Sequence, residues 1–147
     1  EMKINELAPV IASREVEVEA SPETIWDIIV AVDSWPDWNP DVKAAFIEGD
    51  LAVGTRFSWK AGQLTIRSTV LQMERPHHLV WTGTTTGIKA VHLWQIEKRG
   101  EKALVRSEES WEGLLPSILR GTMKRMLSRS IQQTLLYLKR EAERRSL

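Results

Sequence analysis

The feature that most constrains this chain is an apolar periodicity running through roughly residues 116–144, near the C-terminus. Pro116 suits the first turn of a helix, where a missing N–H costs little. At 1.5 Å per residue the helix would be about 40 Å long, so it needs an extended apolar surface to lie on. Apolar side chains recur at steps of three and four residues, which places them on one side of this helix: Ile118, Leu119, Met123, Met126, Leu127, Ile131, Leu135 and Leu138.

Most of the remaining sequence predicts strands that would supply this surface. Short runs of strand-forming residues between turn signals favour an antiparallel meander. No repeat, low-complexity segment or linker interrupts the chain, so we predict a single α+β domain over residues 1–147, with one curved sheet on the C-terminal helix. The predicted strands cover residues 14–20, 41–47, 55–60, 64–73, 79–84, 88–97 and 102–111.

The segment after the first strand predicts short helical structure. Ser21 suits a helix cap and Pro22 the first helical position, and apolar residues continue to Val32. Residues 33–40 contain two prolines and predict a compact turn or one helical turn. Residues 1–11 are predicted to form a loose lead-in to the first strand.

Composition argues against several kinds of function. The chain contains 20 basic residues (Lys and Arg) and 20 acidic residues (Asp and Glu), so no excess of positive charge favours binding to nucleic acid or to a membrane. The chain has no cysteine, which excludes disulfides and thiolate chemistry, and no apolar run approaches the ~18 residues of a membrane span. The N-terminal residues lack a signal-peptide pattern. We therefore expect a cytoplasmic monomer or homodimer with no nucleic-acid partner and no stable membrane insertion.

Familiar catalytic and cofactor motifs are missing from the sequence. It contains no glycine-rich phosphate loop, no Gly-x-Ser-x-Gly elbow and no His-Glu-x-x-His pair. We therefore predict no cofactor and no metal, and the sequence identifies no catalytic residue.

The last predicted hairpin carries the sharpest local inference. If Arg99 and Gly100 form a two-residue loop, His92 lies opposite Ser107, and Glu109 is a diagonal neighbour of His92 on the more apolar face. Two alternatives remain open for each ionisable group. Glu109 is either hydrated at the rim of the sheet or lines a pocket. His92 is either a half-buried imidazole with its hydrogen bonds made inside the protein or a residue that contacts a ligand. A Ser107–His92–Glu109 triad is conceivable but lacks an obvious oxyanion hole.

Tryptophan is the one unusual component, with seven in the chain beside two Phe and one Tyr. The indoles either pack the core or line a pocket, and we favour the pocket because wide aromatic side chains are hard to close-pack beneath one helix. The predicted ligand-binding residues are Trp59, Trp81, His92, Trp94, Glu109, Trp111 and Met126.

Several segments together resemble the START-like superfamily, which includes polyketide cyclase/dehydrase and lipid-transport proteins and the Bet v 1 allergens. They are residues 19–26 (EASPETIW), 35–40 (WPDWNP), 76–81 (PHHLVW), 92–96 (HLWQI) and 108–115 (EESWEGLL). The last two segments are similar to the closing strands of bacterial members. The resemblance covers about residues 13–137, and order and spacing carry it more than any single motif.

This resemblance implies a helix-grip fold. In it, a seven-stranded antiparallel sheet wraps around the long C-terminal helix, with two short helices after the first strand. It also implies a deep cavity for lipids, sterols, polyketides or aromatic compounds, and it adds Trp38 to the predicted ligand-binding residues. Catalytic residues do not carry over, and the single tyrosine, Tyr137, lies late on the helix, which puts cyclase activity in doubt.

Three functions are compatible with these observations. The first is binding of a small hydrophobic ligand whose polar end His92 and Glu109 orient. The second is a polyketide cyclase/dehydrase-type enzyme in which His92 or Glu109 moves a proton. The third is an accessory domain whose surface binds a partner protein.

Overall fold

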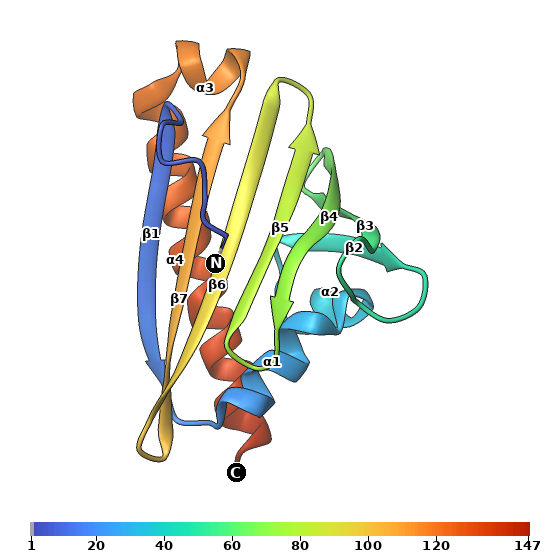
Figure 1. The fold of residues 1–147 in the computed structure, drawn as a ribbon, viewed down its shortest axis with the longest axis vertical. Helices are drawn as coiled ribbons and strands as arrows, with labels where there is room; N and C mark the ends of the chain where they lie inside the picture. The colour runs from blue at the N-terminus through green and yellow to red at the C-terminus, as the bar shows by residue number, and fades with distance from the viewer. Residues whose placement is uncertain (1) are drawn as a thin grey trace.

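The computed structural model describes residues 2–147 and confirms the predicted fold class (Figure 1). The strands are β1 (Val10–Val18), β2 (Val42–Ile47), β3 (Arg56–Ala61), β4 (Leu64–Glu74), β5 (His78–Thr85), β6 (Ile88–Arg99) and β7 (Lys102–Glu112). Between β1 and β2 lie α1 (Pro22–Val30), the 3-10 turn η1 (Val32–Ser34) and α2 (Trp35–Trp38). After β7 come α3 (Leu114–Ile118) and α4 (Arg120–Arg145).

All seven strands form one antiparallel sheet in the order β1-β7-β6-β5-β4-β3-β2. Strands β2 to β7 are neighbours in chain order, which confirms the predicted meander, and β1 joins the sheet beside β7. In Figure 1, α4 runs along the side of the sheet formed by β1, β7 and β6, while α1 lies beside the C-terminal end of α4. The predicted cap of α1 is confirmed, because Ser21 Oγ accepts a hydrogen bond from the Thr24 backbone N–H at 3.2 Å.

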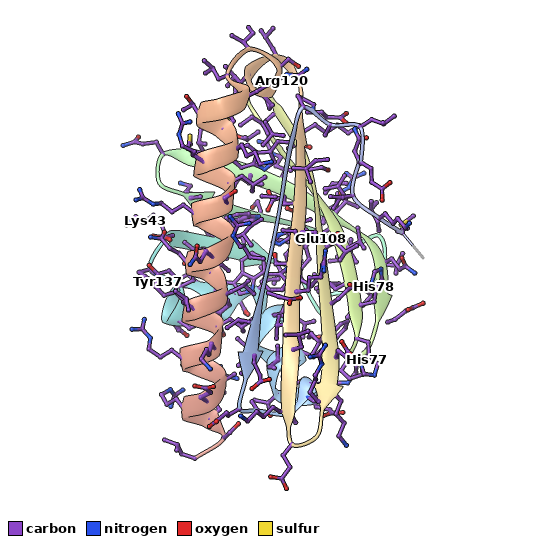
Figure 2. All side chains as sticks on the ribbon, turned by 90° about the vertical axis from the view of Figure 1, so that its left-hand side faces the viewer. Lys43, His77, His78, Glu108, Arg120 and Tyr137 are labelled. Atoms are coloured by element: carbon purple, nitrogen blue, oxygen red, sulfur yellow. The ribbon has the colours of Figure 1, made fainter. Side chains whose placement is uncertain are left out.

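A narrow apolar seam holds α4 on the sheet, and Figure 2 shows the helix lying alongside the strands. Its buried residues are spaced about one turn apart and pack mainly along β1. Ile118, Leu119 and Met126, which the periodicity placed on the apolar side, are instead 44–66% exposed. Within residues 2–147, no helix has the length and apolar character needed to cross a membrane. The buried seam consists of Met123, Leu127, Ile131, Leu135, Leu138 and Ala142.

The predicted start of the long helix at Pro116 was wrong, because the helix is broken at Leu119. Gly113 turns the chain with φ +118°, and a Cβ there would lie 2.7 Å from the carbonyl oxygen of Gly87. The Leu115 N–H then donates to that same carbonyl at 3.3 Å, so α3 docks on the β5–β6 turn. One straight helix would not both dock on this turn and follow β1, and the break separates the two directions.

Residues 2–11 are part of the structure, so the prediction of a loose lead-in over residues 1–11 was wrong for the described residues, and residue 1 lies outside them. β1 already begins at Val10, where the chain pairs with Trp111 of β7. Before it, Ile4 is 9% exposed and packs with Val80 and Leu93 on the face of the sheet opposite α4. This segment therefore covers apolar side chains that the sheet would otherwise present to water.

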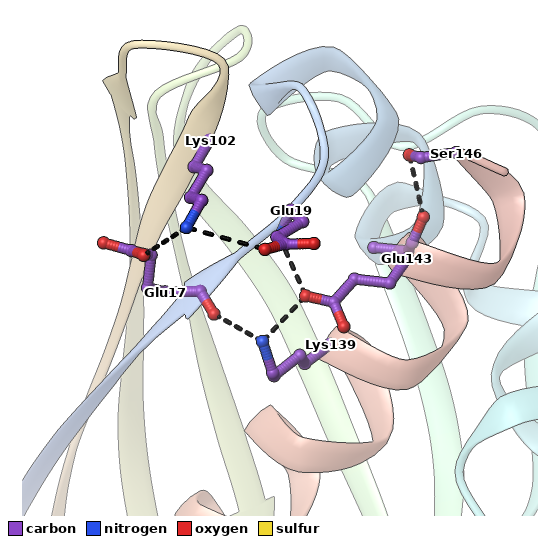
Figure 3. Close-up of polar contacts among 7 residues, drawn as sticks. Glu17, Glu19, Lys102, Lys139, Glu143 and Ser146 are labelled. Carbon is purple, nitrogen blue, oxygen red and sulfur yellow. Dashed lines mark hydrogen bonds and ion pairs between the residues drawn. The ribbon is translucent and has the colours of Figure 1, made fainter.

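A polar network fixes the C-terminal end of α4 to the end of β1 (Figure 3). Lys139 Nζ donates to the Glu17 carbonyl oxygen at 2.9 Å and to Glu143 Oε2 at 2.7 Å. Glu143 Oε2 also accepts the Glu19 backbone N–H at 2.9 Å, and these bonds lower the pKa of Glu143. Lys102 lies beside Glu17 and Glu19, at 3.2 and 3.5 Å. The network and the apolar seam together determine how α4 lies across the sheet.

Candidate ligand-binding site

The site residues lie on the β6–β7 hairpin, whose register differs from the predicted one by two residues. Arg99 pairs with Lys102, so the turn is formed by Gly100 and Glu101 rather than Arg99 and Gly100. Gly100 has φ +62° at the first turn position, where a type II′ turn favours glycine. Because side chains alternate with a period of two, this shift keeps the same residues on the face toward α4. It also places His92 directly opposite Glu109 instead of diagonally.

A chain of polar contacts links four side chains on this face. His92 Nε2 lies 2.7 Å from Ser107 Oγ, and His92 Nδ1 lies 3.5 Å from Glu109 Oε1. The Trp111 indole N–H donates to Glu109 Oε2 at 2.6 Å. Among residues 2–147, no Lys or Arg lies within ion-pair distance of Glu109. The carboxyl group is therefore held by an imidazole and an indole, without a permanent positive charge.

Burial shifts the pKa values of His92 and Glu109 in opposite directions. The His92 and Glu109 side chains are only 15% and 17% exposed. Desolvation lowers the pKa of His92 to about 3 and raises the pKa of Glu109 to about 7, while the Trp111 hydrogen bond opposes the second shift. At neutral pH, His92 is uncharged and Glu109 is close to its midpoint, so within the usual range of cellular pH Glu109 gains and loses a proton while His92 stays neutral.

The contacts between Ser107, His92 and Glu109 resemble a Ser-His-acid triad, but their chemistry does not suit a hydrolase. Ser107 is 1% exposed, so its hydroxyl is shielded from an incoming carbonyl group. An imidazole with a pKa of about 3 is also a weak base for removing a serine proton. The arrangement is better suited to orienting a polar group, or to exchanging a proton between Glu109 and a bound ligand.

Tryptophan rings surround His92 on the same face. Trp81 lies at the centre, with its ring centroid 5.4 Å from His92, 5.6 Å from Trp35 and 6.4 Å from Trp94. The exposed fractions of Trp35, Trp81 and Trp94 are between 3% and 6%. Phe57 joins the group edge-to-face against Trp81 at 5.4 Å. These rings pack against one another, and we call this group, with Trp59 at 5.7 Å from Trp35, the aromatic cluster.

Sequence reasoning missed Trp35 as a member of this cluster. Trp35 begins α2, and its indole N–H donates to the carbonyl oxygen of Ile29 at 2.9 Å. The available signal was the Trp35-Pro36 pair, because proline suits the first turn of a helix and a helical turn would carry the indole inward. The sequence predicts a compact or helical turn over residues 33–40 but does not assign Trp35 to the site.

Two buried indole N–H groups have no hydrogen-bond partner within residues 2–147. They belong to Trp38 and Trp94, which are 8% and 4% exposed. A buried donor without an acceptor costs about 1–3 kcal/mol. A ligand or water that supplies an acceptor oxygen to either group would recover this energy. Trp94 stands next to His92, with ring centroids 4.9 Å apart, so its free donor is beside the polar chain.

Two hollows lie on the described surface, and the first borders the aromatic cluster at Phe57. One, of about 870 Å³, is lined by Asp33 and by residues of β2 to β5, including Phe57 and Ser68. The other, of about 440 Å³, lies over β4 to β7 around His77 and His78. Neither contains any of the predicted ligand-binding residues, so a cavity between the sheet and α4 stays a prediction.

The structure brings together most, but not all, of the predicted site. Trp59, Trp81, His92 and Trp94 are in contact within the aromatic cluster, and Glu109 and Trp111 adjoin them through His92. Trp38 is buried in the same apolar core. Met126 is 51% exposed, away from the buried seam of α4.

Comparisons with known proteins give the same picture of the fold. A START superfamily protein from Mycobacterium smegmatis is 21% identical, with a TM-score of 0.80 over 91% of this chain and 97% of that one. An aromatase/cyclase from a Streptomyces species is 16% identical, with a TM-score of 0.81 over 93% and 95%. A norcoclaurine synthase variant from Thalictrum flavum is 14% identical, with a TM-score of 0.74 over 93% and 96%.

Among curated proteins, no sequence matches this chain. The model of one protein family does, and it covers almost the whole domain. That family is described as polyketide cyclase / dehydrase and lipid transport, and the match extends over residues 9–143, from the start of β1 to the last turns of α4. This chain therefore belongs to the polyketide cyclase/dehydrase and lipid transport family.

Proposed function

We propose that this protein binds a small hydrophobic ligand, such as a lipid, a polyketide or an aromatic compound, between the sheet and α4. One observation carries the proposal: a His–Glu pair without a neighbouring cation is buried among tryptophans on the face toward α4. A plain core gains nothing from such a pair, because an apolar pair of similar volume avoids its desolvation cost. Buried groups of this kind are common where a ligand needs them.

The polar groups of the site favour an uncharged ligand with an acceptor oxygen. Trp94 offers a free N–H, whereas Glu109 would repel a carboxylate whenever it is ionised. The aromatic walls suit rings or acyl chains. Membership of a family that includes polyketide and lipid proteins supports this ligand class.

Tryptophan fluorescence provides the direct test. Because Trp81 and Trp94 are almost fully buried, a ligand enters only when the rings move apart, which changes their emission. At pH 8 we expect a flavonoid or a fatty-acid methyl ester to shift the spectrum, and the corresponding free fatty acid to bind at least about tenfold more weakly. Trp94→Phe, which removes the free N–H and keeps an aromatic ring, should weaken binding of the oxygenated ligand about tenfold.

The exposed variant Phe46→Ala serves as the control, because Phe46 is 58% exposed and outside the aromatic cluster. No spectral change with any lipid, sterol or flavonoid would contradict ligand binding and favour a partner-binding domain instead. Equal binding of the ester and the acid would contradict the proposed role of Glu109.

A second function, a cyclase/dehydrase-type enzyme, is favoured by the opposite pKa shifts of His92 and Glu109. A carboxyl group with a pKa of about 7 beside a neutral imidazole is suited to general acid–base work at neutral pH. The aromatase/cyclase and the norcoclaurine synthase share this fold, which accommodates enzymes as well as binding proteins.

For an enzyme, we expect His92→Gln and Glu109→Gln each to lower turnover of a poly-β-keto substrate mimic about 100-fold, with little change in its affinity. Turnover would be followed by mass spectrometry of the cyclised product, and affinity by tryptophan quenching. If both variants turn over at the rate of the unchanged protein, the acid–base role is excluded and binding alone remains.

A further inference from the structure

The end of the molecule formed by α3 and the start of α4 presents apolar side chains to water. Leu114 and Ile118 are 69% and 66% exposed and stand one helical turn apart, while Leu115 and Pro116 hold α3 against the body of the protein. Leu119 is 44% exposed at the break, and Met126 is 51% exposed two turns further along α4. We call these four exposed residues the α3 tip: Leu114, Ile118, Leu119 and Met126. Figure 1 shows α3 at the opposite end of the molecule from the C-terminus.

Positive charge gathers beside the α3 tip although the whole chain is neutral. Residues 113–140 contain no Asp or Glu. Arg120, at the end of α4 beside α3 (Figure 2), is exposed. So are three other cations within the first three turns of α4, and among residues 2–147 none of the four has an acidic partner within ion-pair distance. These cations are Arg120, Lys124, Arg125 and Arg129.

We propose that the α3 tip docks this protein on an anionic lipid bilayer, with the apolar side chains inserted at the interface and the four cations on lipid phosphates. Protruding Leu, Ile and Met flanked by Arg and Lys are the composition of an interfacial membrane contact. The first turn of α4 has no side-chain cap, so its N–H groups also suit a phosphate. The contact lies on the surface and requires no spanning helix.

A lipid surface fits this region better than a protein partner or a second copy of the chain. Stable protein interfaces bury more than ~1,000 Å² and are anchored by Trp, Tyr or Arg in well-packed pockets. The α3 tip has only four exposed apolar residues and none of them is aromatic. Its cations and the anionic headgroups are complementary in charge, and this match does not depend on whether the inner site is occupied.

Vesicle co-sedimentation tests the proposal with the full chain. We expect binding to vesicles of equal parts phosphatidylglycerol and phosphatidylcholine, at least tenfold weaker binding to pure phosphatidylcholine, and weaker binding in high salt. Leu114→Asp/Ile118→Asp and Lys124→Glu/Arg125→Glu should each lower binding to the mixed vesicles at least tenfold.

Matched controls distinguish vesicle binding through the α3 tip from nonspecific hydrophobic binding and from an effect of net charge. Phe46→Asp/Leu64→Asp removes two exposed apolar side chains elsewhere, and Lys43→Glu/Lys60→Glu makes the same change in net charge on β2 and β3. Both should bind vesicles as the unchanged protein does. Equal binding to neutral vesicles, equal losses in the controls, or dimerisation through Ile118 without vesicle binding would overturn the proposal. The assay needs no inner-site ligand, so its failure leaves the ligand-binding function intact.

Discussion

Trp81→Ala is expected to lower the free energy of unfolding by about 3–5 kcal/mol, the usual range for truncating a fully buried aromatic side chain. Trp81 is 3% exposed, and its ring lies between Trp35, Phe57 and Trp94. Removing the indole deletes apolar contact area and leaves a void that the surrounding wide rings close only in part. Urea denaturation followed by far-UV circular dichroism would measure this loss without relying on tryptophan emission.

Two comparisons make the Trp81 result interpretable. Phe46→Ala, at a position that is 58% exposed, should change stability by no more than about 0.5 kcal/mol. The loss of stability for Trp81→Phe should fall between the two, because phenylalanine keeps one six-membered aromatic ring in place of the two fused rings of the indole. A loss below about 1 kcal/mol for Trp81→Ala would mean that the indole borders open space rather than packed core. Such a small loss of stability would favour a preformed cavity beside Trp81.

Much of this fold could be read from sequence because its local and long-range signals agree. Short runs of strand-forming residues between turn signals predicted every strand, and Ser21-Pro22 predicted the start of α1. Three predictions were wrong: the unbroken long helix, the loose N-terminal lead-in and the register of the last hairpin. The break at Leu119 arises because α3 docks on the Gly87 carbonyl, a contact 28 residues away in sequence that apolar periodicity does not encode. The hairpin register depended on which turn position Gly100 occupies.

The candidate site was partly predictable for the same reason. The predicted and observed registers differ by two residues, so alternation along β6 and β7 places His92 and Glu109 on one face in both, and their proximity was expected. The inward direction of Trp35 depends on a four-residue helix that propensity alone does not specify. Met126 was predicted to face the sheet because steps of three and four residues are compatible with a wide apolar face of the helix. The helix α4 in fact buries only one residue per turn, and Met126 is not among them.

Glu109→Gln is expected to stabilise the protein relative to the unchanged chain by a margin that grows with pH. Burial raises the pKa of Glu109 from 4.5 to about 7, so the folded protein keeps a proton that the unfolded chain releases. Stability of the unchanged protein therefore falls as pH rises through the window from about 4.5 to 7. Glutamine has nearly the same shape and does not ionise, so the variant escapes this loss, which amounts to about 3 kcal/mol at 1.36 kcal/mol per pKa unit.

The opposite shift at His92 makes the comparison with the variant necessary. Burial lowers the pKa of His92 from 6.5 to about 3, so the protein also loses stability as pH falls below 6.5. The unchanged protein alone thus shows two opposing trends, whereas its difference from Glu109→Gln, measured by urea denaturation from pH 4 to pH 8, isolates the carboxyl group. Glu108→Gln, on the opposite face of β7, makes the same charge change outside the site and should not reproduce the gain. A flat difference for Glu109→Gln would show that Glu109 is hydrated, and would remove both its acid–base role and its discrimination against carboxylates.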